Sequence, residues 1–141
     1  MTRIASAFAL AALLACGACA TTKKEPPPKP FVGTKWNVVL ELPIAGEQPY
    51  VRFGDGRMEG FGGCNRIAAR YVQDSVGAKA IAIGRIQGGR HACDRSAQDA
   101  EDRVLEVLQA VSSYSITADT MSMTGSAGTL RFRAAPAEGK P

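Results

Sequence analysis

The chain has 141 residues and a mass of 14.8 kDa, which leaves room for one small domain. It is 45% hydrophobic, 6% aromatic and 21% charged, which excludes a disordered chain and a bundle of membrane-spanning helices. The formal net charge of +4 is spread along the chain and is too weak to indicate a nucleic-acid-binding protein. With a single histidine, His91, the sequence predicts neither a metal site nor a cofactor.

The first 20 residues have the features of a bacterial export signal. Residues 4–15 form an apolar stretch that is too short to remain in a membrane as a spanning helix. The end of this segment resembles a lipobox, in which a peptidase cuts before a cysteine that is then acylated. Cys16 fits best, because Leu13 stands three residues before it. Two alternatives stay open: acylation of Cys19, or cleavage after Ala20 to release a soluble periplasmic or secreted protein.

A segment rich in proline and charge follows the export signal. Residues 21–30 read TTKKEPPPKP, a composition that favours an extended polyproline II spacer. We therefore predict a linker over residues 21–33. Gly17 stands directly after Cys16 where an aspartate would retain the protein in the inner membrane, so we expect an outer-membrane anchor facing the periplasm.

Short strands are predicted in the first half of the domain that follows, which we place at residues 34–133. Trp36, Val38, Leu40 and Leu42 alternate with other residues, as expected for a half-buried strand. The run Gly54-Asp55-Gly56 predicts a hairpin turn, because Asp-Gly tolerates positive φ. The strands expected in this half lie at residues 36–42, 50–53, 57–59, 67–72 and 79–86.

The apolar period changes to that of a helix over residues 97–111. Ser96 is its predicted N-cap, with Asp99 as a capping-box partner and Val111 in its last turn. Strands are expected again at residues 114–117, 121–123 and 130–132, and residues 134–141 are predicted to be a disordered tail. The fold class is therefore α+β and mostly β: a small curved antiparallel sheet or open β-barrel of about seven strands, packed against one amphipathic helix.

The run GFGGCNR at residues 60–66 resembles the signature of the META domain, found in HslJ-type heat-shock lipoproteins of bacterial envelopes. The matching signature residues are Gly62, Gly63, Cys64, Asn65 and Cys93. The resemblance covers about residues 34–133 and implies an antiparallel, barrel-like α+β domain. It departs at residues 89–93, GRHAC, where the family usually has Thr-x-Met-Ala-Cys. It implies association with the envelope under stress, such as heat or antibiotic exposure, and no established reaction.

Two cysteines of the domain could carry chemistry. In an exported domain, Cys64 and Cys93 are expected to form a disulfide, although free buried thiols or a reactive or metal-binding pair remain open. Gly62 and Gly63 are expected at a sharp bend of the sheet, where the Asn65 side chain satisfies backbone groups.

The loop around His91 holds three arginines, Arg85, Arg90 and Arg95. A solvated loop is the favoured interpretation, and a surface for an anionic partner such as lipopolysaccharide phosphates is the alternative. We expect a non-enzymatic envelope lipoprotein that is held at the membrane by its lipid anchor and binds an envelope protein or an anionic envelope component. Two other functions stay open. One is a periplasmic inhibitor of a hydrolase, and the other is a thiol-dependent enzyme that uses Cys64 or Cys93.

Overall fold

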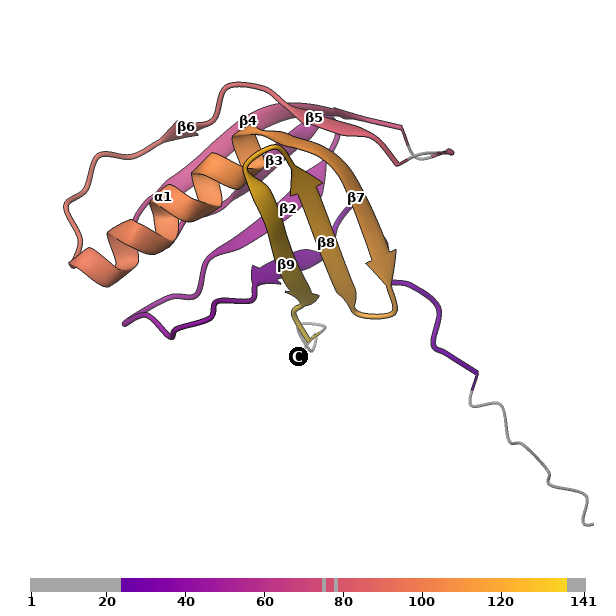
Figure 1. Ribbon diagram of the computed structural model, residues 1–141, viewed down its shortest axis with the longest axis horizontal. Coiled ribbons are helices and arrows are strands. Elements are labelled where there is room, and N and C mark those ends of the chain that lie inside the picture. Colours follow the sequence, from indigo (N-terminus) through magenta and orange to yellow (C-terminus); the bar gives the residue numbers. More distant parts are fainter. Residues whose placement is uncertain (1–23, 75, 78, 137–141) are drawn as a thin grey trace, which may run out of the picture.

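The computed structural model describes residues 24–74, 76–77 and 79–136, which form a strongly curved antiparallel sheet with one helix (Figure 1). Nine strands occur within these residues. They are β1 (Lys35–Val38), β2 (Tyr50–Gly54), β3 (Arg57–Phe61), β4 (Arg66–Gln73), β5 (Ile81–Ile83), β6 (Gln87–Gly88), β7 (Val111–Thr117), β8 (Thr120–Gly125) and β9 (Gly128–Ala134). The helix, α1, runs from Arg95 to Gln109.

The sheet nearly closes into a barrel. Eight strands follow one another in the order β5-β4-β3-β2-β1-β9-β8-β7, and β6 pairs with β4 beside this path. The two end strands approach each other through a bridge between Ala80 and Ser113, and Tyr114 N–H donates to the Lys79 carbonyl. The prediction of an antiparallel, barrel-like α+β fold is confirmed, with nine strands among the described residues where about seven were expected.

The barrel encloses one apolar core, and α1 covers it. Trp36, Phe53, Met58 and Phe132 are essentially fully buried among the strands. The helix adds Val104, Val107 and Leu108 at helical spacing, and it packs against β5, β8 and β9. The alternation of buried and exposed residues along the strands is the pattern expected of a sheet with one face on the core.

The hairpin turn predicted at Gly54-Asp55-Gly56 forms between β2 and β3. Asp55 and Gly56 have φ angles of 47° and 71° between β2 and β3, as required for a tight hairpin turn. The first strand is shorter than predicted, because pairing with β9 ends at Val38 and the chain then leaves the sheet toward Pro43. Leu42 is consequently 78% exposed, not part of the buried face.

The helix starts earlier than predicted, and Ser96 is not its N-cap. Asp94 caps the helix: its side chain accepts the Ala97 N–H at 3.0 Å and the Ser96 hydroxyl at 2.6 Å. Asp99 therefore has no part in a capping box, and instead lies 3.7 Å from the Arg95 guanidinium. Val111 lies in β7, because the helix ends two residues before it.

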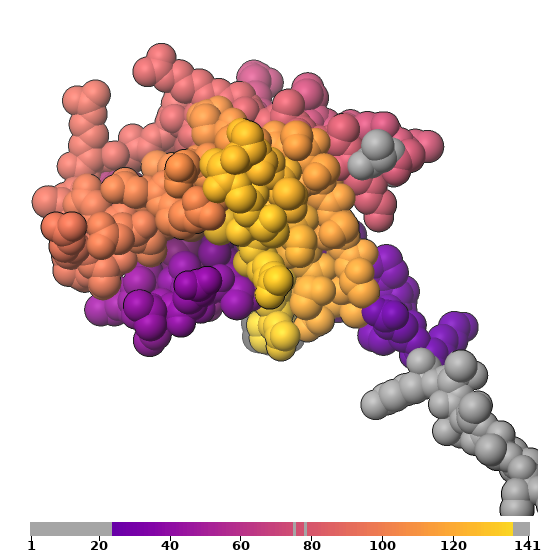
Figure 2. Space-filling model, viewed as in Figure 1, coloured from indigo at the N-terminus to yellow at the C-terminus, as the bar shows by residue number. Residues whose placement is uncertain are grey.

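The end of the predicted linker belongs to the folded domain. Phe31 is buried, its ring centroid lies 4.3 Å from that of Phe53, and its carbonyl accepts the Trp36 indole N–H. Lys29 N–H donates to the Ala118 carbonyl in the β7–β8 turn. The first described residues thus leave the domain at the end opposite α1, as Figures 1 and 2 show.

At the other end of the chain, Ala134 is the last residue of β9 and pairs with Trp36 of β1. The disordered tail predicted from residue 134 therefore starts too early. The predicted export signal, with Cys16 and Cys19, lies outside the described residues. Within the part of the chain that is described, no helix is long and apolar enough to cross a membrane.

Candidate functional site

A tight turn between β3 and β4 carries the signature residues. Gly62 N–H donates to the Asn65 carbonyl at 2.8 Å, which reverses the chain over four residues. Gly63 has a φ of 128°, a conformation that residues with a side chain rarely adopt. This turn leaves the backbone N–H groups of Cys64 and Asn65 facing α1, where they need an acceptor.

The acceptor is the Glu101 carboxylate on α1. Its Oε2 accepts the Cys64 N–H at 3.0 Å and the Asn65 N–H at 2.5 Å, and its Oε1 accepts the Asn65 side-chain amide at 2.9 Å. A Cβ added to Gly62 would lie only 2.7 Å from Oε2. The glycine therefore makes room for the carboxylate, and the carboxylate fastens the turn to the helix.

From the sequence, Glu101 was expected only to add negative charge near the helix start, and its contact with the turn was not predicted, although a signal was present. Glu101 follows Ala97 by four residues and precedes Val104 by three, so it lies on the buried face of the helix. An acidic residue on an apolar face needs a polar partner. The sequence does not reveal that this partner is a turn 36 and 37 residues earlier.

The loop before α1 is fastened to the same turn. Cys64 and Cys93 form the predicted disulfide, with their Cα atoms 5.8 Å apart. Asn65 Oδ1 accepts the His91 N–H at 2.9 Å and lies 3.2 Å from His91 Nδ1. The Asn65 side chain is therefore structural, as predicted, but it bridges two other segments, whereas we expected it to bond within its own bend.

The helix start completes this corner of the molecule. The hydrogen bonds that Asp94 accepts, first from the Ser96 hydroxyl and then from the Ala97 N–H, lower the pKa of its carboxyl. We call residues 62–65, 91–94 and Glu101 the turn–helix corner. Among the described residues, no group of three or more histidine, cysteine or acidic side chains could hold a metal ion.

Comparison with known proteins identifies the domain. The model of the META domain matches residues 29–137. The chain belongs to the META domain family. No curated protein matches it. An NMR structure of a protein from Burkholderia xenovorans has the same fold, with a TM-score of 0.60 at 19% identity over 96% of this chain and 99% of the other. A second NMR structure has a TM-score of 0.55 at 16% identity, covering 71% and 87%.

Membership in the META family indicates a bacterial envelope-associated protein. It agrees with the resemblance seen in the signature residues. The match begins at residue 29, and in the structure the Lys29 N–H donates to the Ala118 carbonyl of the barrel. The two solved structures support the fold of the META domain alone.

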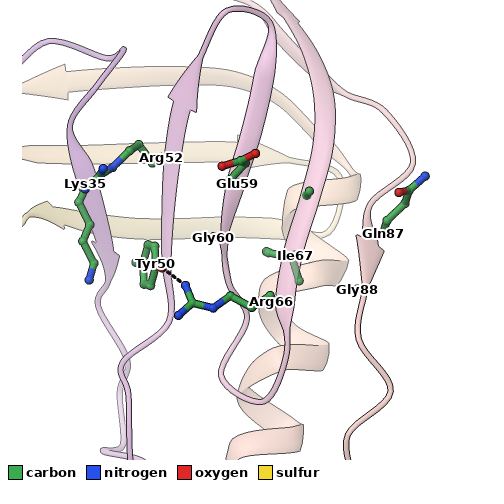
Figure 3. A pocket seen from close by; sticks show the side chains of 10 residues that line it. Lys35, Tyr50, Arg52, Glu59, Gly60, Arg66, Ile67, Gln87 and Gly88 are labelled. Carbon is green, nitrogen blue, oxygen red and sulfur yellow. Dashed lines mark hydrogen bonds between the residues drawn. The ribbon is translucent and has the colours of Figure 1, made fainter.

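The outer face of the META sheet holds a second feature, a groove of about 530 Å³. Lys35, Arg52 and Arg66 line it together with a single carboxylate, that of Glu59. Figure 3 shows Tyr50 between Lys35 and Arg66, with the Arg66 guanidinium donating to the Tyr50 hydroxyl. We call this feature the basic groove. No pattern in the sequence predicted this groove.

The three arginines considered as an alternative anionic-partner surface do not form one group in the META domain. Arg85 lies on the sheet face, where it lines a smaller hollow with Arg57 and Arg70. Arg95 is 92% exposed and lies beside Asp99 on α1. Arg90 and His91 are exposed in the loop between them. The smaller hollow borders the basic groove, because Ala68 and Gln87 line both.

Proposed function

We propose that this protein is a non-enzymatic lipoprotein of the bacterial envelope. In this proposal, an acylated Cys16 anchors it to the outer membrane, facing the periplasm. Its META domain binds or supports envelope components under stress. One observation carries the proposal: the signature groups that could do chemistry are engaged in internal bonds. Cys64 and Cys93 are joined to each other, and the polar groups of Asn65 and Glu101 are bonded across the turn–helix corner.

The Cys64–Cys93 disulfide also argues against the alternative function, a thiol-dependent enzyme. A thiolate is the reactive form of cysteine, and a cysteine in a disulfide cannot supply one. A thiol-dependent activity would need Cys64 or Cys93 to be free in the protein as its host makes it. The oxidation state in the envelope therefore separates the two functions.

The test is the intact mass of the protein purified from its own host, with alkylation before and after reduction. We expect a mass that begins at Cys16 and includes acyl chains, with Cys64 and Cys93 alkylated only after reduction. Cys19 should be alkylated in both samples, which serves as an internal control. Cys16→Ser should abolish the acyl mass, and Cys19→Ser should retain it.

An unmodified chain beginning at Thr21 would overturn the anchor. Alkylation of Cys64 and Cys93 without reductant would support the thiol enzyme instead. The stress role has its own test, survival of a deletion strain after heat or antibiotic exposure. Complementation by the wild-type gene but not by the Cys16→Ser gene would show that the anchored form is needed.

A further inference from the structure

The basic groove contains cations without matching carboxylates. The Glu59 carboxylate is bonded at 2.6 Å to Arg57, which lies outside the groove. The Arg66 guanidinium has a carboxylate, that of Glu47, only at 4.0 Å. Within the described part of the chain, neither Lys35 nor Arg52 lies within 4.0 Å of a carboxylate. The groove therefore presents an excess of positive charge that the domain does not neutralise.

The sheet register places two of these cations at directly opposed positions. Lys35 on β1 is paired with Arg52 on β2. Arg52 is paired on its other side with Glu59 on β3, whose carboxylate is bonded to Arg57. Like charges in directly opposed positions are unfavourable in an antiparallel sheet. An anion bound between them would replace this repulsion with two attractions. Binding of an anion would therefore stabilise the arrangement of Lys35 and Arg52.

Tyr50 holds the other side of the groove in place. The Lys35 ammonium lies 4.0 Å from the centroid of the Tyr50 ring, a cation–π geometry. The Arg66 guanidinium donates to the hydroxyl of the same ring. One aromatic side chain thus positions a cation at its face and another at its edge, so that the charges are arranged before a ligand binds.

One small residue on the outer face keeps the groove open. Ala68 on β4 lines the groove on the same face as Glu59, whereas Gly60 alternates with Glu59 and lies on the core side of β3. Ala68 lies opposite Glu59 on one side and Gln87 on the other. Its methyl group leaves space that a larger side chain would fill. The volume of about 530 Å³ lies within the usual range of small-ligand sites.

From this arrangement we infer that the basic groove binds a phosphoryl group, between Lys35 and Arg52 with Arg66 at its edge. Guanidinium groups match phosphate oxygens through paired N–H donors, and an ammonium serves as a compact point charge. The inference rests on the proposed binding role and names the chemistry of the ligand. The phosphoryl group could belong to a lipid headgroup or to a free phosphate, and the experiment separates these sources.

The test uses the full, host-processed chain, labelled with ¹⁵N in nonionic detergent micelles at low salt. One arm titrates inorganic phosphate, and the other adds phosphatidylglycerol to the micelles. Backbone amide shifts are followed at Lys35, Arg52, Ala68 and Gln87. We expect saturable shifts at these positions, which weaken as salt is added because exposed charges are screened. The arm that saturates at the lower concentration identifies the source.

Three variants make the test specific. Lys35→Gln/Arg52→Gln removes the opposed cations and should weaken binding about tenfold. Arg131→Gln/Arg133→Gln removes two exposed cations of β9, outside the groove, and should leave binding unchanged. Ala68→Leu keeps every charge but fills the space, and it should also weaken binding.

The inference is overturned if neither arm shifts the groove amides. It is equally overturned if the two double variants weaken binding alike, since binding would then follow net charge alone. These outcomes leave the proposed function standing when the intact mass shows the acylated chain. Conversely, an unacylated chain that still binds phosphate would overturn the proposed lipid anchor and leave the inference about the basic groove standing.

Discussion

The turn–helix corner and the basic groove lie on either side of Arg66, yet they handle polar groups in opposite ways. In the corner, a partly buried carboxylate and two backbone donors satisfy one another, and a disulfide joins the turn to the loop before α1. In the groove, two cations occupy opposed positions, and neither lies within 4.0 Å of a carboxylate among the described residues. Polar groups in the corner bond to one another and stabilise the fold, whereas the cations of the groove are available to bind an anionic ligand.

The disulfide should give the largest effect on the corner side of this comparison. Replacing both cysteines, Cys64→Ser/Cys93→Ser, removes a cross-link between residues 29 positions apart. The chain-entropy estimate for a loop of this size is about 3.5 kcal/mol of unfolding free energy. Urea denaturation of the variant and of the oxidised and reduced wild type would measure it. Cys19→Ser removes a thiol without touching the cross-link and should not change the midpoint.

Glu101→Gln should give the next largest effect. The amide keeps the shape of the side chain but turns one of its two acceptor oxygens into a donor that faces other donors. Leaving such groups unpaired should lower the unfolding free energy by about 2 kcal/mol. Asp102→Asn removes the same charge from the neighbouring exposed position of α1. If that control lost as much stability, helix charge and not the turn contact would explain the result.

Gly62→Ala tests the space that the carboxylate needs. A Cβ at this position would approach Glu101 Oε2 to 2.7 Å, so either the side chain or the turn must move. We expect a loss of about 1–2 kcal/mol in urea denaturation. Gly54→Ala is the matched control, because nothing lies within 4 Å of its added Cβ. The Gly62 variant should lose little further stability when combined with Glu101→Gln, since both act on one contact.

The corner could be predicted in part because its parts follow local rules. Period-two alternation placed the hairpins, since each strand buries one face, and the exported context predicted the Cys64–Cys93 pair. The N-cap was misplaced, because Asp94 and Ser96 both suit that position and the hydrogen bond to Ala97 decides between them. The contact of Glu101 with the turn joins segments that are far apart in the sequence, and no local sequence pattern predicts such a contact.

The groove could not be predicted, for a related reason. Along any one strand, alternation identifies Lys35, Arg52 and Arg66 only as exposed residues. Their position relative to one another depends on the register of β1 with β2 and of β3 with β4. Closeness along the chain instead grouped Arg85, Arg90 and Arg95. The sheet places only Arg85 beside the groove.

The smallest predicted effect is that of Lys35→Gln/Arg52→Gln. The double variant removes a repulsion between directly opposed cations, but it also removes the Lys35–Tyr50 cation–π contact and the opposition of Arg52 to Glu59. Because these effects have opposite signs, we expect the unfolding free energy in urea denaturation to stay within about 0.5 kcal/mol of the wild type. Loss of more than about 1 kcal/mol would show that these cations stabilise the fold, and the contrast between the two regions would then be wrong.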